Sequence, residues 1–175
     1  MTKKVLLVLA VLSLCLVACD RTPKTYQDAE KQFISSLTQA DTVAVLKLGS
    51  TVMRCLKQGQ VDSAMLNLYV LKDDELRPMD EASKARFSER FTVRPVQSYM
   101  ISGMSFSTPG VNDLSFRFSP NENVNNGALK LMFNPVKVDG QWYLAVKDAF
   151  MMSKDLASKP EPNAPVPAPV KLVLD

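Results

Sequence analysis

Three polar side chains in the second half of the 175-residue chain could form an acid/base site. Tyr99, Asp113 and Arg117 lie in segments where apolar and polar residues alternate, as they do in half-buried β-strands. A carboxyl group buried beside a tyrosine can transfer protons near neutral pH, because burial raises its pKa. The alternation also supports a plainer interpretation, in which Asp113 and Arg117 lie on the solvent face of their strand, opposite Leu114 and Phe116. In that case, substituting Asp113 changes neither ligand binding nor stability by much.

The composition excludes several kinds of chemistry. The chain has no histidine, so Ser-His-Asp and Cys-His catalysis and histidine metal sites are all excluded. Asp73, Asp74 and Glu75 form a dense acidic run, but the run is contiguous and lacks the glycine of a calcium loop, which indicates a solvated turn before Pro78. The nine methionines are scattered, which is typical of core filling. We therefore expect no metal, no cofactor and no catalytic residue.

The N-terminal segment has the pattern of an export signal. Residues 1–18 combine Lys3 and Lys4 with an apolar run that is shorter than the about 20 residues of a membrane span. Residues 16–19 read Leu-Val-Ala-Cys, which resembles the lipobox of bacterial lipoproteins. The resemblance implies that residues 1–18 are a signal peptide that is removed, that Cys19 carries acyl chains such as palmitate, and that residues 19–27 tether the protein to a membrane. An ordinary signal peptide that contains a cysteine is the alternative.

The charge of the chain bears on its partners. Removing Lys3 and Lys4 with the signal takes two positive charges from a net charge of +3, and the near-neutral remainder argues against nucleic-acid binding. We expect a membrane contact through the lipid on Cys19, and either an envelope protein or a second copy of the chain as partner. The inner or outer membrane and the leaflet stay open.

The other cysteine of the mature chain and the C-terminus give two further predictions. Cys55 lies at helical spacing with Val52 and Leu56, which predicts a buried thiol on the apolar face of a helix. Residues 157–175 contain five prolines that alternate with small residues, which predicts an extended tail without a helix or paired strand over residues 159–170. The tail could be a ligand for a proline-binding partner, but a disordered terminus is the favoured interpretation.

The region between these ends changes its hydrophobic period once. Up to residue 90 the apolar spacing is helical apart from one short strand, and from residue 92 apolar and polar residues alternate. The predicted helices are a stretch from about residue 26, a long helix over 41–58, a short one from residue 62 and another over 80–90. The predicted strands cover 69–72, 92–106, 113–118, 128–138 and 141–147, with a tight Asp139-Gly140 turn between the last two.

This element order resembles the nuclear transport factor two-like (NTF2-like) family. Besides the element order, two segments resemble the family: Gly-Gln-Val-Asp-Ser-Ala at 59–64 and Val-Asp-Gly-Gln-Trp-Tyr-Leu at 138–144. It implies an α+β domain over residues 28–156, in which three helices pack on a curved antiparallel sheet and form a cone. A cystatin-like arrangement is the alternative fold. In the family, the open end of the cone holds small molecules and the sheet face mediates pairing, so the fold does not decide the function.

Two functions remain open at this stage. The first is a non-enzymatic, membrane-anchored binding or assembly module of the bacterial cell envelope. The second is a small-molecule-binding cone with lyase or isomerase activity, in which Tyr99, Asp113 and Arg117 would line the pocket. A deep pocket with at least two inward polar side chains would favour the second.

Overall fold

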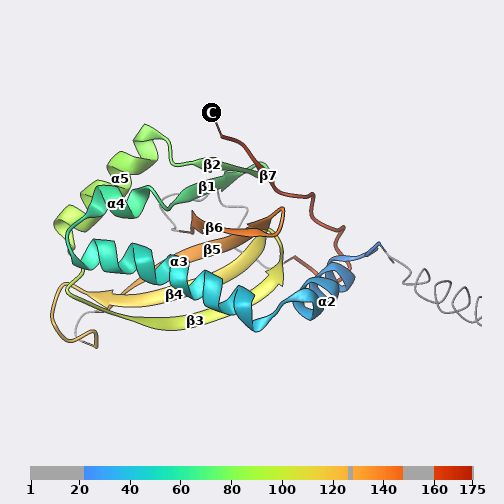
Figure 1. The fold of residues 1–175 in the computed structure, drawn as a ribbon, viewed down its shortest axis with the longest axis horizontal. Coiled ribbons are helices and arrows are strands. Elements are labelled where there is room, and N and C mark those ends of the chain that lie inside the picture. Colours follow the sequence, from blue (N-terminus) through green and yellow to red (C-terminus); the bar gives the residue numbers. More distant parts are fainter. Residues whose placement is uncertain (1–21, 126–127, 148–159, 175) are drawn as a thin grey trace, which may run out of the picture.

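The structure is a computed structural model that describes residues 22–125, 128–147 and 160–174. The predicted signal peptide and Cys19 lie outside the described residues. The helices, labelled as in Figure 1, are α2 (Tyr26–Ser36), α3 (Gln39–Lys57), α4 (Val61–Met65) and α5 (Glu81–Val93). The strands are β1 (Tyr69–Lys72), β2 (Glu75–Pro78), β3 (Ser98–Thr108), β4 (Val111–Ser119), β5 (Leu129–Val138), β6 (Gln141–Val146) and β7 (Lys171–Leu172).

All the strands belong to one curved, unclosed sheet in the order β3-β4-β5-β6-β1-β2-β7. The pairs from β3 to β6 and the β1–β2 pair are antiparallel, whereas β1–β6 and β2–β7 are parallel. Figure 1 shows α3 lying along one face of this sheet, with α2 at one end and α4 and α5 at the other. The predicted α+β fold with helices packed on a curved sheet is therefore confirmed.

The long helix α3 has a clear start signal in the sequence. The Thr38 side chain accepts a hydrogen bond from the backbone N–H of Asp41, and the Asp41 carboxylate accepts one from the backbone N–H of Thr38. This capping box satisfies two backbone donors that the first helical turn leaves free. The helix thus begins at Gln39, two residues before the predicted start, because Asp41 lies inside its first turn.

The main core lies between α3, α5 and the concave face of the sheet. Its fully buried side chains include Val52 and Met53 of α3 and Leu114, Phe116 and Phe133 of the sheet. A second, smaller cluster on the opposite face of β5 and β6 joins them to β1, β2 and β7. The Cys55 prediction is only partly right, since the thiol is half-buried at the margin of the main core.

The C-terminal tail differs from the favoured prediction of a disordered terminus. Residues 163–170 carry no regular structure, as the prolines predict, but β7 follows them and pairs with β2. The backbone N–H of Lys171 donates to the carbonyl oxygen of Asp74 at 2.9 Å, and that of Val173 donates to the carbonyl of Leu76 at 2.9 Å. The sequence could not show this, because the edge of β2 supplies the partners and β2 is a strand that the sequence pattern did not predict.

Candidate binding cavity beneath the C-terminal tail

The structure does not bring Tyr99, Asp113 and Arg117 together into one site. The Tyr99 ring lies half-buried on the helix-covered face of the sheet, with its centroid 6.2 Å from that of Phe116. Asp113 and Arg117 alternate with the buried residues of β4 and lie on the other face. Asp113 pairs there with Lys147, whose Nζ atom is 2.6 Å from the carboxylate, and Arg117 is exposed.

The concave face itself has little space opposite the middle of α3. A Cβ atom added to Gly49 would lie 2.4 Å from Leu114 Cδ2 and 2.9 Å from a ring carbon of Phe116, so the helix backbone is pressed against the sheet. Leu114 and Phe116 are fully buried there. Side chains of the core therefore fill the space between the middle of α3 and the sheet.

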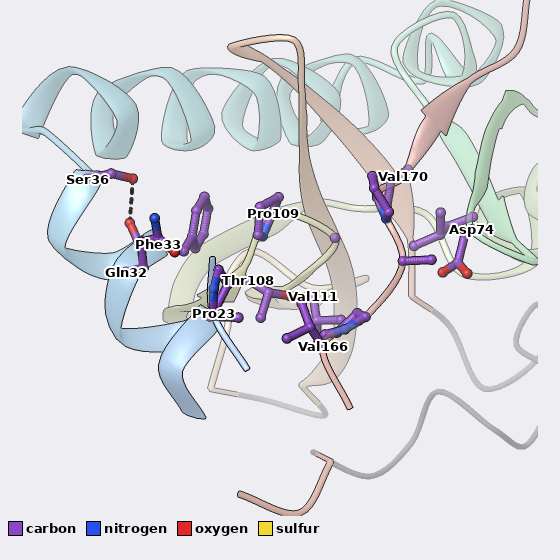
Figure 2. Close-up of a pocket in the computed structure, with 16 residues that line it drawn as sticks. Pro23, Gln32, Phe33, Ser36, Asp74, Thr108, Pro109, Val111, Val166 and Val170 are labelled. Carbon is purple, nitrogen blue, oxygen red and sulfur yellow. Dashed lines mark hydrogen bonds between the residues drawn. The ribbon is translucent and has the colours of Figure 1, made fainter. Parts of the chain in front are cut away.

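A cavity of about 440 Å³ lies instead at the end of the sheet where α2 and the C-terminal tail meet. Figure 2 shows Gln32, Phe33 and Ser36 of α2 on one side, Asp74 and Val170 on the other, and the end of β3 with the start of β4 between them. The 16 wall residues are mostly aliphatic, proline or glycine. The volume is within the range of pockets that hold small molecules.

One wall of the cavity, the β3–β4 turn, is fixed by a buried polar network. The Asn134 side chain accepts from the backbone N–H of Asn112 at 2.7 Å and donates to the carbonyl of Gly110 at 2.7 Å. The Asn112 side chain donates to the carbonyl of Pro135 at 2.6 Å. Leaving a buried amide group without a hydrogen-bond partner destabilises the fold, so these bonds hold the turn in one position.

Another wall is the C-terminal tail, which contributes residues 166–170 and whose Val170 side chain lies against Gly110 of the turn. The tail also contacts the start of α2, where the backbone N–H groups of Tyr26 and Gln27 donate to the carbonyls of Ala164 and Pro162 at 2.9 and 3.2 Å. These bonds satisfy two of the free donors of the first helical turn. The tail is thus a strap that runs from α2 to β2 across the cavity.

The polar groups of the wall are few. Thr108 is only 2% exposed, and its hydroxyl has no hydrogen-bond partner among the described residues. Gln32 and Ser36 are exposed on α2, and Asp74 lies in the tight turn between β1 and β2. Asp74 is the single ionisable side chain among the 16 wall residues.

This arrangement suits binding better than catalysis. Acid/base chemistry needs at least one titratable group close to the substrate, held in place by further polar side chains. Here the ionisable Asp74 is exposed, and the fixed turn opposite presents Thr108 and aliphatic groups. Within the described ranges, no group of three or more Cys, Asp or Glu side chains could hold a metal ion.

This cavity could hardly be predicted from the sequence. Its walls come from residues 23–36, 71–74, 108–111 and 166–170, which have no common periodicity. The proline-rich tail was a usable signal, because its extended form was predictable, but the surface that receives it was not.

Comparisons with known proteins concern the fold. No protein-family model and no curated protein matches the sequence. Among solved structures, a DUF4783 family protein from Bacteroides uniformis ATCC 8492 aligns with a TM-score of 0.38 and 12% identity, over 55% of this chain and 89% of that one. An NTF-2 like protein of unknown function from Shewanella oneidensis MR-1 aligns with a TM-score of 0.39 and 10% identity, over 59% of this chain and 93% of that one.

Proposed function

We propose that this protein is a lipid-anchored, non-enzymatic binding module of the bacterial cell envelope, and that the cavity under its C-terminal tail holds a small, largely apolar ligand. The observation that carries the binding function is the cavity of about 440 Å³ with aliphatic walls and the unpartnered Thr108 hydroxyl. The Leu-Val-Ala-Cys segment supports the anchor. The element order and the helices packed on a curved sheet support an NTF2-like domain.

The anchor and the described domain are compatible. No helix among the described residues is long and apolar enough to cross a membrane. The helix α2 begins at Tyr26, only seven positions after Cys19, so a lipid on that cysteine would hold the folded domain close to the bilayer. The separated Tyr99, Asp113 and Arg117 give no support to a lyase or isomerase.

The anchor is tested with the Cys19→Ser variant of the full chain. We expect it to lose acyl labelling and to leave the membrane fraction, whereas Cys55→Ser keeps both. Cys55 is a matched control because it is a half-buried thiol within α3. Equal membrane association of the two variants would contradict the lipid anchor.

The ligand is tested by native mass spectrometry of the acylated protein extracted from its own membrane. We expect a reproducible small adduct on the intact chain. Val111→Phe should lose the adduct, because Val111 is on the cavity wall and the larger ring fills the space. Val93→Phe is the matched control, since Val93 is 72% exposed at the end of α5. A second polypeptide without a small adduct would favour an assembly module and contradict the ligand.

A further inference from the structure

Resting on the proposed function, we infer that the ligand is one acyl chain of a bilayer phospholipid, which the cavity accepts directly from the membrane beside it.

The lining fits an acyl chain because most of its residues are apolar, and Thr108 is the one buried polar residue among them. Figure 2 shows Gln32 and Ser36 at the α2 end and Asp74 at the β1–β2 end, with Pro109, Val111 and Val166 among the residues between them. An acyl chain has no polar atom along its length, so it needs apolar contacts through the middle of a cavity. A ligand with several internal polar groups would leave them unsatisfied against this wall.

The cavity is close to the predicted lipid site in sequence. Pro23 lies on the wall, only four positions after Cys19 in the sequence. A fully extended chain covers about 3.5 Å per residue, so Cys19 is at most about 14 Å from Pro23. If Cys19 is anchored in the bilayer, this end of the cavity therefore lies at the membrane surface, where phospholipid is in great excess over other apolar molecules.

The lipid on Cys19 itself is the less suitable occupant. Stable attachment to a membrane takes two lipid signals, so withdrawing one of the protein's own chains would weaken its anchor. A phospholipid of the bilayer has no such effect on attachment.

The tail wall offers a route for the chain to enter. β7 has only two residues and is joined to β2 by two backbone hydrogen bonds, and residues 162 and 164 of the tail accept two more from the start of α2. The wall formed by the β3–β4 turn is held by the buried Asn112 and Asn134 side chains. When the cavity opens, the tail is therefore the part that moves.

The single tryptophan of the chain reports on the cavity. The Trp142 ring is 8% exposed, its centroid is 6.2 Å from that of Phe33, and Phe33 lies on the cavity wall. Bromine atoms quench tryptophan at short range, so phospholipid with brominated acyl chains should quench this buried ring when a chain enters the cavity beside Phe33. We expect quenching when the acylated full-length protein is placed in vesicles of brominated phosphatidylcholine, and none in vesicles of the unbrominated lipid.

Variants test where the chain enters. Val111→Phe should raise the brominated fraction needed for half-maximal quenching roughly tenfold, which corresponds to about 1.4 kcal/mol. Val93→Phe should leave it unchanged. Ala168→Phe is a second cavity-filling variant, on the exposed tail, and should have the same effect as Val111→Phe. Because Ala168 is outside the core, this variant keeps the test valid even if Val111→Phe fails to fold.

The outcomes separate this inference from the proposed function. Quenching that the two cavity-filling variants do not weaken would overturn the inference, because the lipid would then reach Trp142 elsewhere. An unquenched wild type that still carries a small adduct in native mass spectrometry would overturn the acyl chain and leave the binding function standing. An unquenched wild type without any adduct would overturn both.

Discussion

Asp41 joins the start of α3 to the hairpin of β5 and β6. One carboxylate oxygen accepts from Lys137 Nζ at 2.6 Å and from Trp142 Nε1 at 2.9 Å. The other accepts from the backbone N–H and the hydroxyl of Thr38, both at 2.8 Å. The hydrogen bond from Lys137, then those from Thr38 and Trp142, hold the pKa of Asp41 well below its usual range.

This pKa shift makes stability depend on pH. Because the folded-state pKa is lower than the ordinary value of 3.8, the charged carboxylate stabilises the fold. The contribution is complete above the ordinary pKa and is lost as the pH falls through it toward the folded-state value. We expect Asp41→Asn to lower the free energy of unfolding by about 2 kcal/mol at neutral pH, and by less at pH 3.

Urea unfolding at the two pH values measures this effect. Asp62→Asn serves as the control, since Asp62 is exposed in the first turn of α4. If Asp41→Asn and the wild type lose the same stability between neutral pH and pH 3, the carboxylate does not carry the pH dependence. The sequence placed Asp41 at a helix start, but Lys137 is 96 residues away along the chain and could not be assigned as its partner.

Asp113 contrasts with Asp41 because its ion pair is open to solvent. Its side chain is 44% exposed, and exposed pairs contribute at most about 1 kcal/mol. We expect Asp113→Asn to change the free energy of unfolding by less than that and to leave the native-mass adduct intact. A large loss of either would contradict the assignment of Asp113 to the outer face of β4.

At the scale of elements, the contact between α3 and the sheet depends on a glycine within the helix. Alanine is the better helix former by about 1 kcal/mol, but overpacking a core costs about 1–3 kcal/mol. Leu114 and Phe116 are fully buried and have little freedom to move away from a new Cβ atom at Gly49. We therefore expect Gly49→Ala to destabilise the protein in urea unfolding, whereas Ser50→Ala, one position along the same helix, does not. A Gly49→Ala variant that is more stable than the wild type would show that helix and sheet can separate at no cost.

The sequence predicted the elements whose signals are local. The long helix, the four long strands and the Asp139-Gly140 turn are all present, and both turn residues have positive φ as a tight hairpin requires. β2 and β7 were missed because β2 reads Glu-Leu-Arg-Pro, with a single aliphatic residue and a proline, and β7 has only two residues. β2 pairs along its whole length with β1, and β7 pairs with the other edge of β2.

At the scale of the molecule, the start of α2 and the C-terminal tail stabilise each other. The tail accepts hydrogen bonds from the first turn of α2 and pairs with β2 some residues later. The cavity exists only because the tail contacts both α2 and β2. Composition and spacing could therefore predict the extended tail, but not where in the fold the cavity forms. Each attachment should therefore influence the other.

The last prediction tests this coupling. Lys171→Pro removes the N–H that donates to the Asp74 carbonyl and keeps the preceding residue extended, whereas Lys171→Ala keeps the donor and is the matched control. Hydrogen exchange should speed up at Val173 and also at Tyr26 and Gln27, roughly tenfold for a local loss of about 1.4 kcal/mol, while amides of α3 keep their protection. Faster exchange at Val173 alone would mean that the tail is held by two independent attachments. In that case, release of β7 would leave the α2 end of the tail in place, and the cavity would open only at its β2 end.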